Sequence, residues 1–290
     1  MLYVGLDLSG KRLDWHARRP DGELVDADAV VPAGDGLARL VYRFGTESVV
    51  AAIESMTGAR FVHDELERAG WDVRIADAAR AKALAPRCCR TDTIDAWVLC
   101  EIGRRDLVPE IWLPDPAVRA ACERARFRLH LARHRTALKN RIHSTLIQHG
   151  HQRPVSDLFG RAGRDFLDRV DFPEPRRGTL LAGLRPIDEL DQDIARAERE
   201  LRALGADHRD IPHLMTCPGI GGLLGDTIAG EIGDIARFPS PPKLVSHTGL
   251  VPRVHQSGRT ARRGPLTTHG PRYLRWALIE AAQTACHNPV

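Results

Sequence analysis

Two short apolar segments near the N-terminus each end at an acidic residue, and two further acids follow one helical turn apart. Asp7 lies at the end of YVGLDL, Glu54 closes SVVAAIE, and Asp92 and Asp95 lie three residues apart in RTDTIDA. Apolar runs of this length are typical of buried strands, whereas a spacing of three places two side chains on one face of a helix. We therefore expect all four carboxylates to meet at one edge of a sheet.

Such a cluster predicts a site for divalent metal. Carboxylates gathered in a partly buried place repel one another and take up protons unless a cation neutralises them. Hard oxygen ligands favour Mg²⁺ or Mn²⁺ over zinc, and phosphodiester chemistry is the leading use of such a site. Taken singly, Asp92 and Asp95 also fit ordinary acids of a first helical turn, which the helix dipole favours.

The order of elements around these acids narrows the fold. Alternation and helical spacing predict strands over residues 3–8, 12–18, 23–31, 48–54 and 71–76, and helices over residues 57–69, 78–84 and 91–103. This α/β succession resembles the ribonuclease-H-like fold, and the spacing of the acids resembles its RuvC-like branch of nucleases, with a DEDD set of carboxylates.

Composition sets the frame for the rest of the chain. With 290 residues, 43% of them hydrophobic, the chain is long enough for a sizeable core and two or three domains. Its six cysteines form no CxxC pair and follow no secretory leader, so we expect reduced thiols in a cytoplasmic protein without structural zinc. No apolar run is long enough to span a membrane. The net charge of +4 favours a polyanionic partner only modestly.

Basic residues concentrate in one predicted helix. Residues 116–153 hold nine arginines and lysines against the single acid Glu123, and no glycine or proline interrupts them from Ala117 to His149. A second helix over residues 186–204 carries paired charges and one apolar face, so the two predict a helical arm, either antiparallel or intermolecular. An excess of nine to one is self-repelling unless phosphate neutralises it, although a solvated helix face is the simpler alternative.

The last third carries two further signals. The turn in LMTCPGIGG resembles a helix-hairpin-helix turn, whose backbone amides bind phosphate, although a tight turn between packed helices explains it equally well. Downstream, a stretch rich in proline and glycine carries Ser257 beside Gly258. Taken alone this serine is typical of a loop, but it lies among Arg253, His255, Arg259, Arg262 and Arg263.

Together these motifs resemble the bacterial insertion-sequence transposases of the IS110 type, the DEDD group that includes the Piv DNA invertases. The matching segments run nearly end to end: GLDLSGK, IESMTG, RTDTIDA, WLPDP, RTALKNRIHSTL, CPGIGG, EIGDIARFPSPPKLVSHTGLVPRVHQSG and GPRYLRWALIEAA. The resemblance implies a RuvC-like catalytic domain (1–112), a helical coiled-coil arm (113–206) and a mainly α C-terminal transposase domain with a serine loop (207–290).

The resemblance also implies a mechanism and partners. It assigns the metal-binding carboxylates to Asp7, Glu54, Asp92 and Asp95, and the nucleophile to Ser257 in the SG pattern. It implies Mg²⁺ or Mn²⁺ as cofactor, DNA as substrate, guidance by a structured bridge RNA, and a homodimer or tetramer with no membrane association. The basic residues expected to bind nucleic acid are Arg119, Arg126, Arg133, Arg135, Lys139, Arg141, Arg253, Arg259, Arg262 and Arg263.

Three departures from the family pattern leave alternatives open. Arg90 stands where lysine is usual, Thr268 stands where a lysine commonly follows the serine, and the sequence stops at Val290, where relatives continue. We therefore expect a C-terminally truncated transposase, and weigh against it an inactive remnant that only binds nucleic acid and a RuvC-like structure-specific nuclease. A sugar-kinase or actin-like ATPase fits poorly, because a second phosphate motif is missing.

Overall fold

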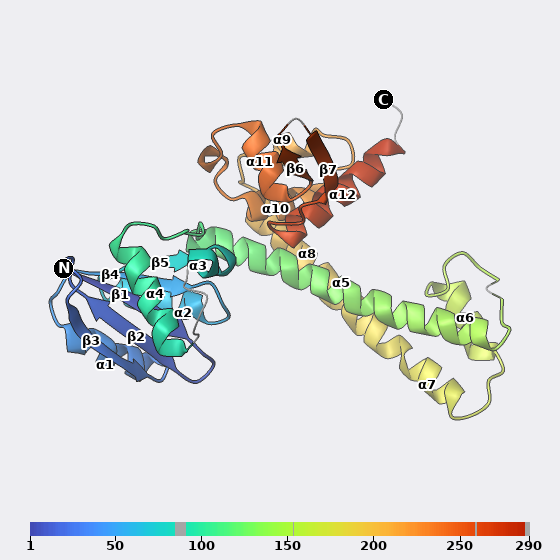
Figure 1. The fold of residues 1–290 in the computed structure, drawn as a ribbon. Helices are drawn as coiled ribbons and strands as arrows, with labels where there is room; N and C mark the ends of the chain where they lie inside the picture. Colours follow the sequence, from blue (N-terminus) through green and yellow to red (C-terminus); the bar gives the residue numbers. More distant parts are fainter. Residues whose placement is uncertain (85–90, 153, 259, 288–290) are drawn as a thin grey trace. The chain divides into compact units, whose positions relative to one another are not determined.

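The structure, a computed structural model, describes residues 1–84, 91–152, 154–258 and 260–287 (Figure 1). Cys88, Cys89, Arg90, Arg153 and Arg259, on which some of our expectations depend, lie outside the described residues. The chain divides into two compact units, Met1–Leu113 and Pro114–Val290, which we describe separately. The boundary that we expected between the arm and the C-terminal domain falls within the second unit.

The first unit is built on a five-stranded mixed sheet. The order β3-β2-β1-β4-β5 joins three parallel strands (β1, β4 and β5) to two antiparallel ones (β2 and β3). The five predicted strands are confirmed, each to within one residue at either end: β1 (Leu2–Leu8), β2 (Leu13–Arg18), β3 (Leu24–Val30), β4 (Val49–Glu54) and β5 (Asp72–Ala76).

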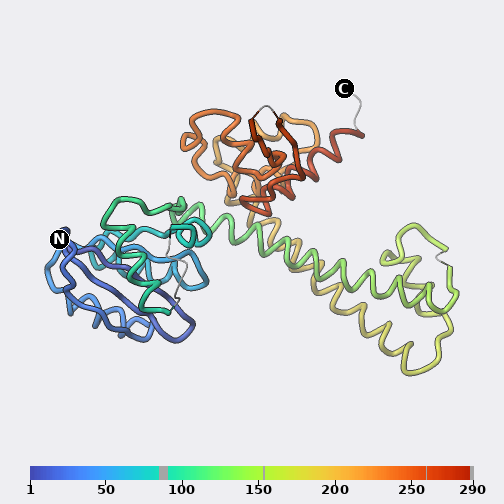
Figure 2. The backbone as a smooth tube through the Cα atoms, viewed as in Figure 1, coloured from blue at the N-terminus to red at the C-terminus, as the bar shows by residue number. Residues whose placement is uncertain are grey.

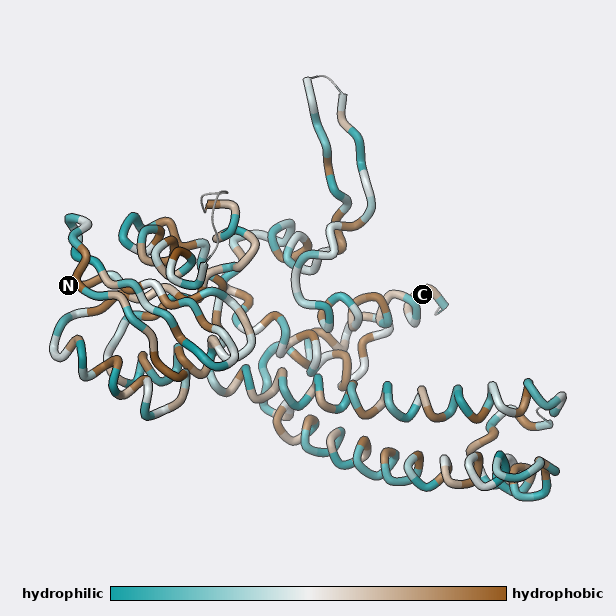
Figure 3. Tube along the Cα trace, turned by 60° about the horizontal axis from the view of Figure 1, so that its bottom comes forward, coloured by the Kyte–Doolittle hydropathy of each residue, from teal (hydrophilic) through white to brown (hydrophobic). Residues whose placement is uncertain are grey.

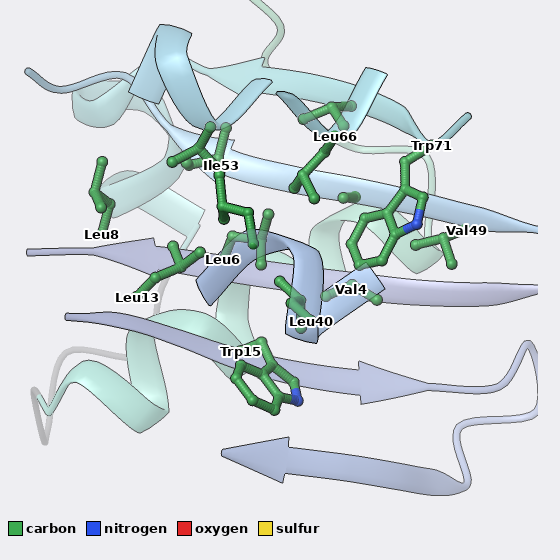
Figure 4. Packing of buried hydrophobic residues seen from close by; sticks show 14 of the residues in the cluster. Val4, Leu6, Leu8, Leu13, Trp15, Leu40, Val49, Ile53, Leu66 and Trp71 are labelled. Carbon is green, nitrogen blue, oxygen red and sulfur yellow. The ribbon is translucent and has the colours of Figure 1, made fainter. Parts of the chain in front are cut away.

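One face of this sheet carries the main core of the unit. Alternation in β1 turns Val4, Leu6 and Leu8 toward helices α1 (Gly34–Phe44) and α2 (Ala59–Arg68), where they pack in the cluster of Figure 4. Helix α1 was not predicted, because glycines in its first turn disguise a helical spacing of apolar residues. Gly36 has a packing reason, since a Cβ there would lie 2.0 Å from the carbonyl oxygen of Val31.

The opposite face is covered by helix α4 (Asp92–Arg104), which lies unusually close to β1. A Cβ on Gly5 would lie 1.9 Å from the carbonyl oxygen of Ala96 and 2.3 Å from the amide nitrogen of Cys100. The Cys100 thiol donates a hydrogen bond to the Tyr3 carbonyl oxygen at 3.2 Å, which ties the middle of the helix to the start of the strand. Helix α4 therefore runs against β1 in the opposite direction and brings its N-terminus to the end of the strand.

We expect Gly5→Ala to destabilise the first unit by about 1 to 3 kcal/mol, because both opposing atoms belong to the backbone and no side-chain rotation relieves the clash. The free energy of unfolding in urea measures the effect. Gly103→Ala is the matched control on α4, since a Cβ there would lie 3.8 Å from Ala52, an ordinary contact. Equal stability of the two variants would contradict this account of the strand–helix approach.

The second unit begins with two long antiparallel helices. Helix α5 (Pro116–Gln148) packs along α8 (Leu184–Gly205), and the two backbones lie side by side in Figures 1 and 2. Asp115 caps α5 by accepting hydrogen bonds from the amides of Ala117 and Val118. At the far end of the pair, α6 (Arg161–Arg169) and α7 (Arg176–Ala182) close a separate apolar cluster around Ile142, Leu146 and Ile187.

The C-terminal part of this unit is mainly helical. Its elements are α9 (Ile211–Met215), α10 (Gly222–Ile232), the short 3-10 helix η1 (Ile235–Arg237), α11 (Pro241–Thr248), α12 (Arg272–Cys286) and a hairpin of β6 (Pro252–Ser257) and β7 (Thr260–Leu266). In the PGIG turn, Gly219 has a φ of 85°, and a Cβ there would lie 2.2 Å from the Ala281 carbonyl oxygen of α12. This contact favours a packed turn between helices. None of the described helices has the length and apolar character needed to cross a membrane.

Candidate functional site

The acids of the first two apolar segments lie side by side at the end of the sheet. Strands β1 and β4 are parallel and pair Leu6 with Ile53, and the next residues along the two strands are Asp7 and Glu54. Both carboxylates therefore leave the sheet on the face that α4 covers, because alternate residues of a strand share a face.

The second pair of acids comes from the first turn of α4. Thr91 caps this helix by accepting a hydrogen bond from the Ile94 amide at 3.4 Å, which starts the helix at Asp92. The positive end of the helix dipole favours Asp92 and Asp95 at this position. Because α4 runs antiparallel to β1, its first turn lies at the end of the strand that carries Asp7.

A fifth carboxylate and two cations, none of which we predicted, also belong to this region. Asp14 of β2 pairs directly across from Asp7 and is 4% exposed. Arg12 holds it with two hydrogen bonds of 2.8 Å, from Nε and Nη2. Lys82 of α3 (Ala78–Leu84) lies 2.9 Å from Glu54. The sequence does place Asp14 two residues after Arg12, which could have indicated an ion pair. The pairing of Asp14 with Asp7 across the two strands, however, cannot be read from the sequence.

The neighbouring acids change the pKa of Asp7. Its pKa is raised to about 6, first by burial and then by the nearby carboxylates of Asp95, Asp92, Glu54 and Asp14, in that order of importance. In the part of the chain that the structure describes, no three Asp, Glu, His or Cys side chains gather closely enough to hold a metal ion. The donor chemistry suits Mg²⁺, whereas the side chains stand apart, with Glu54 held by Lys82.

The raised pKa of Asp7 predicts a pH-dependent stability. In the folded state Asp7 binds its proton more tightly than in the unfolded chain, so its contribution to stability falls as the pH rises from about 4 to about 6. In EDTA at pH 7.5, Asp7→Asn should therefore melt at a higher temperature than the wild type, and the two melting curves should converge below about pH 4.

Asp35→Asn provides the control, because Asp35 is an exposed acid of the first turn of α1. Thermal melting followed by circular dichroism across this pH range makes the measurement. A difference in melting temperature between Asp7→Asn and the wild type that does not change with pH would refute the raised pKa of Asp7.

Ser257 lies in a regular hairpin, and our expectation of a loop was wrong. It is the last residue of β6, paired with Thr260 of β7, and every residue of β6 is exposed. The hairpin projects from its unit as a two-stranded ribbon in Figure 3. Cross-strand partners share a face, so the pair of His255 and Arg262 lies on the same face as Ser257, while Arg263, opposite Val254, lies on the other. Because the side chains of this hairpin are almost all exposed, its sequence lacks the alternation of apolar and polar residues that would have predicted the two strands.

Acids from distant segments neutralise part of the charge of the basic helix, which our count of charges along this helix did not include. Arg126 binds Glu231 of α10 with hydrogen bonds of 2.7 and 3.0 Å, and Arg135 binds Asp191 of α8 at 2.6 Å. Arg124 and Arg128 pair in the same way with Glu200 and Glu198. These acids offset the charges of four arginines of α5 through the fold.

Other basic residues of α5 lie over aromatic rings or point to solvent. The Arg133 guanidinium lies 5.6 Å from the ring centroid of Tyr273, and the Lys139 ammonium lies 4.8 Å from that of Phe159. Arg141 is exposed and Arg119 is half-buried. Arg133 and Arg141 are therefore better candidates for an external anion than Arg126 and Arg135.

The chain is similar to known proteins along most of its length. Residues 211–290 match the model described as "Transposase IS116/IS110/IS902 family", and residues 4–150 match the IS110-type DEDD transposase model. A probable family 20 transposase of Pseudomonas aeruginosa is 29% identical over 241 residues, which cover 81% of this chain and 70% of that protein. The transposase for insertion sequence element IS1328 of Yersinia enterocolitica is 26% identical over 235 residues, with the same coverage of both chains.

Proposed function

The chain belongs to the IS116/IS110/IS902 family of insertion-sequence transposases, and from this premise we propose that it cuts and rejoins DNA with a carboxylate-bound metal and a nucleophilic serine. The observation that carries the proposal is the convergence of β1, β4 and the N-terminus of α4, the three elements to which Asp7, Glu54, Asp92 and Asp95 belong. The mixed sheet order supports a RuvC-like domain of the ribonuclease-H-like type.

The four acids hold the metal in this proposal. A bound Mg²⁺ or Mn²⁺ supplies a Lewis acid that neutralises charge on the phosphoryl oxygens. Asp7 would contribute a carboxylate whose pKa is raised by burial and by the neighbouring acids, and a bound cation would favour its ionised form. Glu54, now paired with Lys82, and Asp92 and Asp95 at the helix N-terminus would supply the other carboxylate oxygens.

Ser257 is the proposed nucleophile. Its Oγ attacks a DNA phosphorus, a phosphoserine ester bond forms, one bridging P–O bond of the DNA breaks, and the released hydroxyl takes a proton. Rejoining reverses these bonds with another DNA hydroxyl, so the phosphodiester energy is conserved. His255 accepts the serine proton and Arg262 binds the phosphate, a division supported by their shared face of the hairpin.

The partners follow from this chemistry. We propose that element ends and target DNA are selected by pairing with a bridge RNA, so that sequence choice needs few base-reading side chains, as in other RNA-guided systems. Exposed Arg141, Arg133, Arg253 and Arg263 are the proposed backbone contacts. Because Ser257 and the acids belong to different units, the active complex brings them together in a dimer or tetramer on nucleic acid.

The test is recombination by the purified chain with its bridge RNA, element-end DNA and target DNA. Joined product in Mg²⁺ and none in EDTA is expected. Binding of both nucleic acids without any cutting in Mg²⁺ or Mn²⁺ would instead support a remnant that only binds. Cutting of branched DNA with no RNA and no joining would support a structure-specific nuclease.

A further inference from the structure

A second feature of the first unit lies outside the acid cluster. A cavity of about 510 Å³ opens between the β1–β2 turn, strands β2 and β3, and helix α1, and we name it the basic pocket. Four cationic side chains line it, and an apolar floor lies beneath them: Lys11, Arg12, Arg39 and Arg43 above Trp15 and Leu40. Its volume lies within the range of roughly 300 to 1,000 Å³ that is typical of pockets for small ligands.

Two of these cations are held in fixed positions. Arg12 is bonded through two nitrogens to Asp14, and Arg43 donates a hydrogen bond of 2.9 Å to Asp26 while its guanidinium lies 5.8 Å from the Trp15 ring. A guanidinium has five N–H donors, so an arginine that uses some of them to bind an acid still has donors left for an anion.

The other two cations are not neutralised by the fold. Lys11 and Arg39 are both exposed, and neither has a hydrogen-bond or ion-pair partner among the described residues. Asp28 is the one acid among the described residues that line the basic pocket. Two uncompensated cations beside two oriented ones favour a ligand with negative charge.

The basic pocket and the acid cluster lie at the same end of the sheet on its two faces. Asp14 pairs with Asp7 on the face that α4 covers, whereas its neighbour Trp15 pairs with Asp28 on the face that α1 covers. Arg12 lies at the rim between them. It binds Asp14 and lines the basic pocket, and Asp92 and Asp28 both contribute to the raised pKa of Arg12 after the dominant hydrogen bond to Asp14.

We propose that the basic pocket binds a phosphodiester group of a single nucleic-acid strand that continues around the end of the sheet to the acid cluster. Lys11 and Arg39 contact the phosphate oxygens directly, while the apolar floor receives the sugar or base of one nucleotide. The pocket thus sets which phosphate of the strand reaches the acids. This inference rests on the proposed function, since it needs a nucleic-acid substrate at the acids.

Binding of labelled single strands to the full chain tests the proposal, with oligothymidylate and oligouridylate of equal length as separate probes to distinguish DNA from RNA. The double variant Lys11→Gln/Arg39→Gln should bind the favoured probe more weakly. The slope of log affinity against log salt should fall by about 0.7, the amount expected when one phosphate of a single strand is no longer neutralised. Arg60→Gln/Arg68→Gln on α2 removes the same charge and should leave the slope nearly unchanged. Equal slopes for both double variants would overturn the proposal.

A chemical footprint gives a second readout that needs no catalysis. The chain has only four lysines, Lys11, Lys82, Lys139 and Lys243, so amine acetylation followed by mass spectrometry reports on each one. Oligonucleotide at saturation should protect Lys11 at least severalfold in the wild type. Saturating binding with Lys11 fully reactive would refute the pocket proposal while leaving the transposase mechanism intact. Protection of Lys11 without DNA cutting in Mg²⁺ would support the pocket proposal and count against the proposed transposase mechanism.

Discussion

Ser257→Ala is expected to abolish formation of a covalent protein–DNA adduct and to lower the rate of DNA joining by roughly 10³-fold or more, as removal of a nucleophilic hydroxyl does in other enzymes. The side chain is exposed on β6, so the substitution leaves no cavity and the hairpin should keep its register. Denaturing gel electrophoresis of reactions with labelled DNA, bridge RNA and Mg²⁺ measures the adduct.

Controls on the same hairpin isolate the chemistry. Gln256→Ala changes a neighbour on the opposite face and should retain the adduct. His255→Ala should lower the rate of adduct formation, because it removes the proposed acceptor of the serine proton from the face of the hairpin that carries Ser257. Ser257→Ala should still bind DNA with the affinity of the wild type. An adduct recovered from the alanine variant would exclude Ser257 as the nucleophile.

Arg126→Ala is expected to destabilise the second unit by about 2 to 4 kcal/mol, because it leaves the Glu231 carboxylate without its partner. The Glu231 side chain is only 3% exposed, while Arg126 is 45% exposed, so the loss should lie below the extreme for a fully buried pair. Urea denaturation of the full chain, followed by a probe in the second unit, measures the change.

Arg124→Ala is the matched control. It removes the same side chain from the same helix, but both Arg124 and its partner Glu200 are more than 40% exposed, so a loss of about 0.5 kcal/mol or less is expected. The double variant Arg126→Met/Glu231→Leu should recover most of the stability, since it removes the buried Glu231 charge together with its partner. Equal losses of stability for Arg126→Ala and Arg124→Ala would show that Glu231 pays no penalty for losing its ion-pair partner.

Much of the first unit could be predicted from local pattern. Alternation marked the five strands, and helical spacing marked α2 and α4, because burial of one face imposes these periods on the sequence. Helix α1 escaped because Gly34 and Gly36 weaken the helical signal, although Leu37, Leu40 and Phe44 supply the spacing.

What escaped prediction depends on contacts between distant segments. Asp14 gains its importance from a register that places it opposite Asp7. Glu198, Glu200 and Glu231 neutralise arginines 70 to 105 positions away only after the helices pack. A count of charges along one helix therefore overstated its need for phosphate. Local charge is visible in a sequence, whereas its compensation is a property of the fold.

The pairing of Lys82 with Glu54, together with that of Arg12 with Asp14, bears on how the protein is made in the cell. Two of the five carboxylates near the end of β1 carry internal counter-ions from the moment the sheet and α3 assemble. A newly synthesised chain thus completes this unit without waiting for a cation supply. Under the proposed function, a divalent ion at Glu54 would therefore have to displace an ammonium that already neutralises this carboxylate.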